Sequence, residues 1–149
     1  MPARDLLHDP VRNALVRDGW TITDDPLRLK VQGRNLYVDL GAERVLAAER
    51  GALAIAVEVK SFVGASDVAD LEEALGQFLL YDLVLRRMEP HRQLFLAVPE
   101  KTWKGIFCDA LGEIVLHERA VRLLVIDPQQ EVIIRWIPST PGETPSSAF

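Results

Sequence analysis

The sequence predicts an α/β fold with a central mixed sheet and helices on both of its faces. Apolar, β-branched segments of strand length occur both before and after residues 66–88, and these residues change to a helical period. The predicted order is a helix, consecutive strands, the long helix, a strand, shorter helices and two last strands. Strands on both sides of a long helix are typical of layered α/β proteins.

The first part of the chain predicts one helix and an antiparallel meander. Apolar residues at helical spacing place the helix within residues 3–18, either along the whole segment or from Asp9 with Pro10 at its first position. Gly19 ends it. The expected strands lie at 19–23, 27–31, 36–40, 44–49 and 51–62, with a turn at Arg50–Gly51 before the last.

Residues 66–88 form the strongest predicted helix. Ser66 is a suitable N-cap, and Asp67 and Asp70 favour the positive end of the helix dipole. The predicted buried stripe consists of Leu71, Leu75, Phe78, Leu79 and Leu85.

A further strand, one or two shorter helices and two last strands complete the predicted domain. They are expected at 92–99, 100–107, 110–120, 122–127 and 131–137. Residues 1–137 are therefore interpreted as a single domain. Residues 138–149, rich in Pro, Ser and Thr, are interpreted as a mobile tail.

Composition narrows the class of protein. A net charge of −5 argues against a protein that coats nucleic acid through phosphate contacts. The single cysteine, Cys108, excludes a disulfide framework and a cysteine zinc site. No apolar run approaches the roughly 20 residues of a membrane span, and the N-terminus does not resemble a signal peptide, so a cytoplasmic location is expected. The early basic residues favour a solvated surface; they are Arg12, Arg17, Arg28, Lys30 and Arg34.

The segment "AIAVEVKSF", residues 54–62, ends an apolar strand with two charges. Because side chains two apart in a strand share a face, Glu58 and Lys60 should project together, and Val57 and Val59 should point the other way. Placing charges beside a core is costly. The pair therefore needs a structural partner or a chemical role, unless the strand is exposed and the two charges are simply solvated.

Asp39 supplies a second carboxylate if its strand pairs with the strand that carries Glu58. Two carboxylates and the backbone carbonyl of Val59 would suit Mg²⁺ or Mn²⁺, which prefer oxygen ligands. Such a metal activates water and polarises a phosphodiester, and Lys60 could orient that water or stabilise negative charge. The residues thus predict a hydrolytic metal site.

The spacing between Asp39 and the segment Glu58-Val59-Lys60 resembles the site motif of the PD-(D/E)xK nuclease superfamily. The predicted order of helices and strands also resembles the core of that superfamily. The resemblance implies a restriction-endonuclease-like α/β/α core, with an antiparallel meander, a long helix and a further strand. Several branches of that superfamily place a glutamine on the long helix facing the metal, which assigns a supporting role to Gln77. An ordinary surface glutamine is the alternative.

A closer resemblance, over about residues 2–137, is to the XisH family of fdxN element excision controlling factors. The blocks that carry it are "DLLHDPVRNALVRDGWTITDDPL", "YVDLGAERVLAAER", "IAVEVKSF", "ALGQFLLY", "FLAVP" and "RWI". It implies action with a site-specific recombinase and an XisI-type protein. Many nucleases of the superfamily have a glutamate on the first helix, where this chain has Asp5, His8 and Asp9. His8 takes the corresponding place, where it could bind a metal or a phosphate, or could only cap or pack the helix.

Two functions follow from these observations. The first is a metal-dependent nuclease-like factor that contacts DNA locally and uses Asp39, Glu58, Lys60 and Gln77. The second is a catalytically inactive module with the same fold that binds an XisI-type partner or the recombinase. A homodimer is expected in either case, because nucleases that act on duplex DNA often pair by two-fold symmetry.

Overall fold

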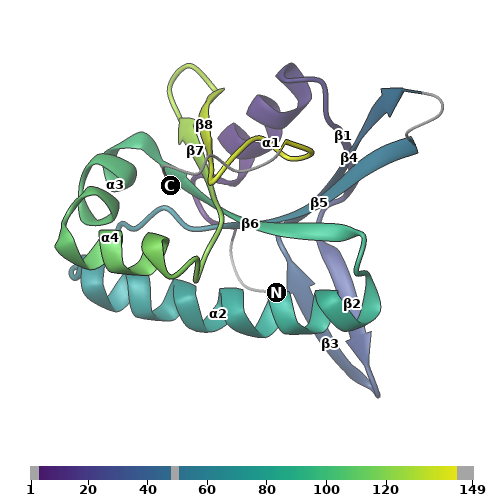
Figure 1. Cartoon of the computed structure of the whole chain (residues 1–149), viewed down its shortest axis with the longest axis horizontal. Helices are drawn as coiled ribbons and strands as arrows, with labels where there is room; N and C mark the ends of the chain where they lie inside the picture. The colour runs from purple at the N-terminus through teal and green to yellow at the C-terminus, as the bar shows by residue number, and fades with distance from the viewer. Residues whose placement is uncertain (1–3, 48–50, 144–149) are drawn as a thin grey trace.

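The computed structural model describes residues 4–47 and 51–143 and contains a six-stranded sheet and a separate two-stranded hairpin. The sheet order is β1-β4-β5-β6-β7-β8 (Figure 1). Its strands are β1 (Thr21–Asp24), β4 (Leu40–Ala47), β5 (Gly51–Val59), β6 (Arg92–Pro99), β7 (Leu123–Asp127) and β8 (Val132–Ile137). The hairpin consists of β2 (Leu27–Val31) and β3 (Arg34–Val38). The helices are α1 (His8–Arg17), α2 (Asp67–Met88), α3 (Glu100–Lys104), the 3₁₀ turn η1 (Ile106–Cys108) and α4 (Ala110–His117).

The predicted mixed sheet is confirmed. β1, β4 and β5 pair antiparallel, β5, β6 and β7 pair parallel, and β8 returns antiparallel to β7. A parallel pair needs a long crossover, and α2 provides it between β5 and β6. The carboxyl ends of β5, β6 and β7 therefore lie at one edge of the sheet.

The meander differs from the prediction at residues 36–40. A single strand was expected there, but β3 ends at Val38 and β4 begins at Leu40. The reason is a change of partner: Val38 pairs with Leu27 in the hairpin, whereas Leu40 pairs with Val57 in the main sheet. Asp39 lies at the point where the chain passes from one sheet to the other. The predicted turn at Arg50–Gly51 lies partly outside the described residues.

Helices cover both faces of the sheet, as predicted. α1 lies on one face, and α2, α3 and α4 lie on the other (Figure 1). Side chains of β5 alternate between two separate cores. Val57 and Val59 pack with residues of α1, whereas Ala56 packs with residues of α2. This alternation places the Glu58 side chain on the α2 side of the sheet.

α2 confirms most of its sequence prediction. The Ser66 Oγ accepts a hydrogen bond from the Ala69 backbone N–H at 3.1 Å, as an N-cap should. Leu71, Phe78 and Leu85 are buried. The prediction for Leu79 was wrong, since 60% of this residue is exposed. It follows Phe78 directly and therefore lies about 100° further round the helix, outside the buried stripe.

The last strands and short helices lie close to their predicted positions. Within the predicted tail, the Ser139 Oγ donates a hydrogen bond to the Glu143 carbonyl at 3.1 Å. Residues 144–149 lie outside the described part of the chain. Across residues 4–47 and 51–143, none of the helices combines the length and the apolar character that a bilayer crossing requires.

Arg122 connects α2 to the sheet. Its Nη2 lies 2.8 Å from Oδ1 of the buried Asp82 on α2, and its Nε donates to the Leu94 carbonyl on β6 at 2.8 Å. The guanidinium also stacks over the Phe78 ring at 5.6 Å. Arg122 and Arg86, whose Nη2 lies 2.7 Å from the other Asp82 oxygen, together neutralise this buried carboxylate, and of the two, Arg122 links it to the sheet.

Arg122→Ala should lower the free energy of unfolding by about 2 kcal/mol, because it removes a charge-assisted hydrogen bond and leaves Arg86 as the remaining partner of the buried Asp82 carboxylate. Urea unfolding measures the loss. Lys104→Ala is the control: it removes an exposed pair with Glu100 at 3.8 Å and should change stability by less than about 0.5 kcal/mol. Equal effects of the two substitutions would contradict the assigned role of Arg122.

Candidate functional site

Asp39 and Glu58 are held together by crossed hydrogen bonds to each other's strand. The Asp39 backbone N–H donates to Glu58 Oε1 at 3.2 Å, and the Val59 backbone N–H donates to Asp39 Oδ2 at 2.7 Å. The antiparallel register, with Leu40 opposite Val57, brings the start of β4 beside the end of β5. The structure therefore brings together the two carboxylates that the sequence selected.

The carboxylate pair retains a proton at neutral pH. Glu58 is only 7% exposed. Burial, followed by the negative charge of Asp39 and a hydrogen bond between the two side chains, raises the pKa of Glu58 to about 9. The Asp39 backbone N–H and the positive charge of Lys60 act on this pKa in the opposite direction. Two acids that cannot both ionise readily are stabilised either by a proton or by a cation.

Lys60 lies on the same side of the sheet as Glu58, as predicted. Its backbone N–H donates to the Ala97 carbonyl on β6 at 3.0 Å, which extends the parallel pairing past the end of β5. Its Nζ lies 3.0 Å from Oε1 of Glu73 on α2. The lysine side chain is mostly buried, while that of Glu73 is mostly exposed. The charge of Lys60 is thus fixed between the carboxylate pair and the helix.

A polar stripe on α2 faces the site. Glu73, Gln77 and Tyr81 are four residues apart and share one side of the helix. Glu73 contacts Lys60 at the start of the stripe. At its end, the pKa of Tyr81 is raised by burial and then by the negative charges of Glu58 and Asp39. Gln77 is half-buried between them.

Sequence reasoning selected Gln77 and missed its two neighbours. Glu73 and Tyr81 lie one helical turn before and after it. The same spacing of four residues, read outward from Gln77, would have identified both. Their roles depend on which side of α2 faces the strand ends, and that orientation is a tertiary property.

His8 occupies a different place from the carboxylate pair. It is buried, and its Nε2 lies 2.8 Å from Oδ1 of Asp25, whose other oxygen is 3.0 Å from the Arg12 Nε. The His8 Nδ1 has no hydrogen-bond partner within the described residues. None of its polar contacts there involves Asp39 or Glu58. The structure thus pairs His8 with Asp25 at the start of α1.

Asp5 connects the N-terminal segment to the site. Its Oδ2 accepts hydrogen bonds from the Ser61 backbone N–H at 3.0 Å and the Ser61 Oγ at 3.1 Å. Its Oδ1 accepts one from the Leu7 N–H at 2.8 Å. This acidic residue of the N-terminal segment therefore uses its oxygens to fix the chain that follows Lys60.

The donor atoms of the site fit a hard divalent cation. Asp39 and Glu58 offer carboxylate oxygens, and the Val59 carbonyl follows Glu58 directly in the chain. Within the described residues, no three His, Cys, Asp or Glu side chains converge as a ligand cluster. Mg²⁺ commonly uses one or two carboxylates and completes its shell with water and substrate phosphate. This donor set matches that pattern better than a closed structural zinc site.

A pocket of about 710 Å³ opens next to the site. Ser61, Pro99 and Pro128, which follow or end the carboxyl ends of β5, β6 and β7, contribute to its lining. Lys101 and Asp67 add one charge of each sign to this otherwise largely apolar surface. Asp39, Glu58 and Lys60 are not among the residues that line the pocket, so it lies beside the site and does not include the carboxylate pair.

Fold and site together define an α/β protein with a two-carboxylate site at the edge of a mixed sheet. The family model described as XisH protein matches residues 1–134, so the chain belongs to the XisH family. No curated protein matches it.

Two crystal structures are similar to the chain over most of its length. An XisH family protein from Nostoc punctiforme PCC 73102 is 45% identical, with a TM-score of 0.78, over 89% of this chain and 99% of that chain. A fdxN element excision controlling factor protein from Anabaena variabilis is 47% identical, with a TM-score of 0.78, over 90% of this chain and 99% of that chain. These similarities confirm the α/β core and the family resemblance found in the sequence.

Glu58→Gln should stabilise the protein at about pH 8 and leave its stability nearly unchanged at about pH 4. The pKa of Glu58 is about 9 in the folded state, against 4.5 ordinarily. Below pH 4.5, Glu58 is protonated in both the folded and the unfolded chain, so it does not lower the free energy of unfolding. Between pH 4.5 and about 9 it is ionised in the unfolded chain and still protonated in the folded one, so the free energy of unfolding falls increasingly as the pH rises. The slope is at most about 1.4 kcal/mol per pH unit.

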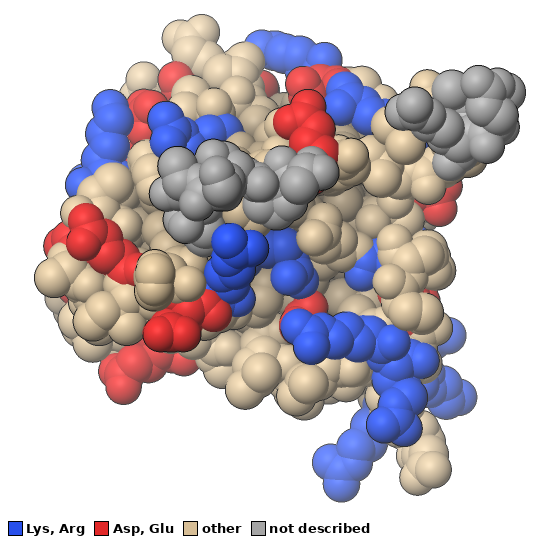
Figure 2. All heavy atoms as spheres, viewed as in Figure 1, with Lys and Arg blue, Asp and Glu red and all other residues tan. Residues whose placement is uncertain are grey.

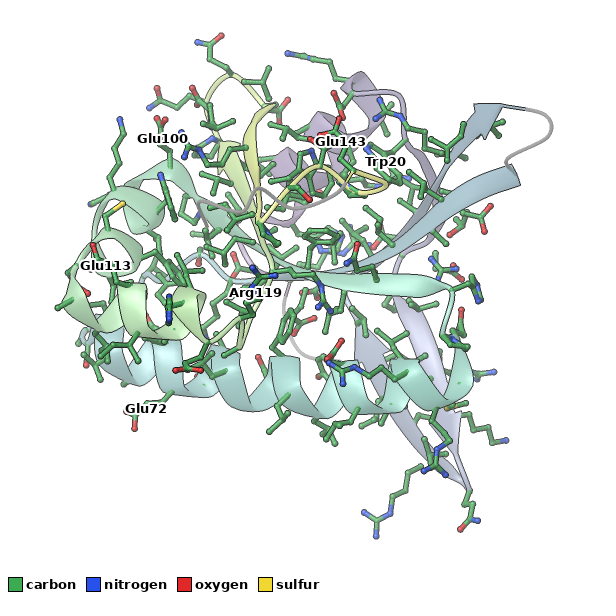
Figure 3. The ribbon with its side chains drawn as sticks, viewed as in Figure 1. Trp20, Glu72, Glu100, Glu113, Arg119 and Glu143 are labelled. Atoms are coloured by element: carbon green, nitrogen blue, oxygen red, sulfur yellow. The ribbon has the colours of Figure 1, made fainter. Side chains whose placement is uncertain are left out.

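Urea unfolding of the parent and the variant across this pH range measures the effect. The amide oxygen of the introduced glutamine can still accept the Asp39 N–H bond, so the substitution changes the charge and little else. Glu113→Gln on the exposed surface of α4 (Figure 3) is the control and should show no such dependence. A stability difference between the parent and Glu58→Gln that stays constant with pH would contradict the shared proton.

Proposed function

We propose that this chain is a nuclease-like DNA-processing factor that controls excision of a DNA element through metal-dependent phosphodiester hydrolysis. The observation that carries the proposal is the carboxylate pair, which holds a proton where a cation would fit, beside a fixed lysine. The relative from Anabaena variabilis is named as an excision controlling factor, which supports a role in DNA rearrangement. The likeness of the motif to PD-(D/E)xK nucleases supports the reaction class.

Asp39, Glu58 and the Val59 carbonyl would hold Mg²⁺ or Mn²⁺. Such an ion, when bound, polarises a phosphodiester and lowers the pKa of its bound water. The protein contributes the rigid placement of the ligands, because each carboxylate is fixed by a backbone N–H of the neighbouring strand. Rigid ligands reduce the reorganisation that charge development would otherwise require.

Lys60 would contact the scissile phosphate or the attacking water. Its Nζ is held by Glu73, whose side chain is mostly exposed and can therefore release the lysine to an incoming phosphate. Tyr81, with its raised pKa, remains a neutral hydrogen-bond donor near the carboxylates. Gln77, between Glu73 and Tyr81, would orient water or a carboxylate through its amide.

The β2–β3 hairpin would contact the DNA backbone. Its inner residues Leu27 and Leu29 pack into the core on the α2 side. Its outer face exposes Arg28, Lys30 and Tyr37, and Figure 2 shows basic side chains gathered where the hairpin projects in Figure 1.

The hairpin is directly continuous with the site, because Val38 at the end of β3 precedes Asp39. Its tip, at Gly33, is six residues before Asp39 and therefore about 20 Å from it at the usual rise per residue of a strand. Cations presented at that distance would hold phosphates of the DNA backbone on one side of the scissile bond. A local basic surface of this kind is compatible with the overall charge of −5.

A second candidate function is a catalytically inactive module that binds an XisI-type protein or the recombinase. The specific observation in its favour is that Lys60 is already paired with Glu73 and Glu58 already holds a proton. His8, which takes the place of the first-helix acid, is paired with Asp25. In this alternative the two acids pair the backbone N–H groups of Asp39 and Val59 and hold no metal.

Glu58→Ala should abolish Mn²⁺ binding measured by titration calorimetry. In the parent chain the ion must displace the shared proton, so the affinity should rise by up to about tenfold per pH unit between pH 6 and about 9. The control Glu113→Ala removes an exposed carboxylate elsewhere and should bind like the parent. Circular dichroism establishes that each variant is folded.

Absence of binding in the parent at any pH in this range would favour the inactive module. Binding that persists in the folded Glu58→Ala variant would place the metal elsewhere. Titrations with Mg²⁺ repeat the comparison with the more abundant ion.

Replacing Arg28, Lys30 and Arg34 of the hairpin with alanine should weaken binding of duplex DNA at low salt and reduce the dependence of affinity on salt. Each lost phosphate contact should lower the slope of log affinity against log salt by about 0.9. Fluorescence anisotropy with a labelled duplex measures both. Lys104→Ala on α3 is the control, and a loss per substituted cation equal to that of the hairpin variant would contradict a specific role of the hairpin.

A further inference from the structure

α2 carries an apolar surface on the side that faces away from the sheet. We call this surface the outer face of α2; it consists of Val68, Glu72, Gly76, Leu79, Leu80, Leu83 and Arg87. The three leucines are 60%, 48% and 54% exposed. Figure 3 shows Glu72 pointing from α2 away from the sheet.

Neither the core nor the candidate site uses the outer face of α2. The core side of the helix is formed by Leu71, Phe78 and Leu85, and the site side by the stripe from Glu73 to Tyr81. At 100° per residue, the outer face lies on the remaining third of the helix. Clustered exposed leucines at helical spacing are typical of a surface that binds another protein.

The outer face of α2 is self-complementary about its centre. A two-fold axis between Leu79 and Leu80, perpendicular to the helix, would place Leu79 of one copy against Leu80 of the other. The same axis would place Leu83 against Gly76. The space beside Gly76 is open, since a Cβ built there meets nothing within 4 Å. A leucine of the second copy could therefore enter the gap that the glycine leaves.

The charges at the two ends follow the same symmetry. The axis that pairs Leu79 with Leu80 also pairs Glu72 with Arg87. Neither residue forms an ion pair within the described part of the chain. They lie about 22 Å apart along the helix, so they cannot pair within one molecule. Parallel packing would instead bring Glu72 against Glu72, which like-charge repulsion opposes.

We propose that the outer face of α2 binds a second copy of this chain, with the two α2 helices antiparallel. We infer a second copy as the partner because Glu72 and Arg87 lie on opposite sides of the centre of the apolar patch. A two-fold axis through that centre brings each of them against its opposite charge, as a two-fold interface requires. A helix of 22 residues spans about 33 Å, enough for a continuous helix-to-helix contact. The proposal is independent of the metal site, which lies on a different side of α2.

Sedimentation velocity of the full chain tests the proposal. The parent should be a dimer at micromolar concentration, and Leu83→Asp should be a folded monomer, because it introduces a charge beside Gly76 of the second copy. Ile114→Asp is the matched control on α4, where a similarly exposed residue, at 62%, is replaced in the same way and the dimer should persist. A monomeric parent, or a dimer that survives Leu83→Asp, would overturn the proposal.

Charge reversal tests the antiparallel register. Glu72→Arg and Arg87→Glu should each raise the dimer dissociation constant by about tenfold, and the double variant should restore most of the lost affinity. Both positions are exposed on the helix surface, so the fold should be unaffected. Additive losses in the double variant would exclude the proposed pairing of Glu72 with Arg87.

Discussion

The crossed hydrogen bonds between Asp39 and the end of β5 are the constraint on which the site depends. Asp39 marks the change from the hairpin to the main sheet, and its backbone N–H is satisfied by Glu58. Its carboxylate in turn satisfies the N–H of Val59. Two backbone groups that would otherwise lack partners are therefore paired by the same two acids that form the site. The burial that makes these bonds effective also forces the acids to share a proton.

Three sides of α2 have different surroundings. One side packs on the sheet, and Arg122 ties it to the strands through Asp82. A second side presents polar residues from Glu73 to Tyr81 to the carboxylate pair. The third exposes leucines to solvent, and the proposed second copy would cover them. Because one rigid helix joins all three, dimerisation would fix the relative position of two candidate sites without altering either.

Much of the fold followed from local patterns. The cap at Ser66, the alternation of Val57 and Val59 with Glu58, and the strand over 92–99 are short-range properties of the sequence, and the structure confirms them. The separate β2–β3 hairpin could not be predicted in this way. Residues 36–40 alternate as one strand would, and only the choice of partner strands divides them at Asp39.

The acidic and basic residues of the candidate site could be predicted from the sequence, whereas the residues of α2 that face them could be predicted only in part. Asp39, Glu58 and Lys60 were evident because charges at the end of an apolar strand are unusual. Glu73 and Tyr81 were missed, since either could equally have faced solvent on α2. The exposure of Leu79 was missed for the same reason: apolar residues cover more than one side of this helix. Which side faces the sheet is decided by packing.

Anomalous diffraction from crystals soaked in Mn²⁺ at about pH 8 would show whether the carboxylate pair binds a metal, because it locates the ion without requiring a known substrate. We expect a manganese peak between the Asp39 and Glu58 carboxylates, within about 2.2 Å of an oxygen from each. A peak at another place, or an intact carboxylate pair with no peak beside it, would contradict the claim that this pair is a metal site.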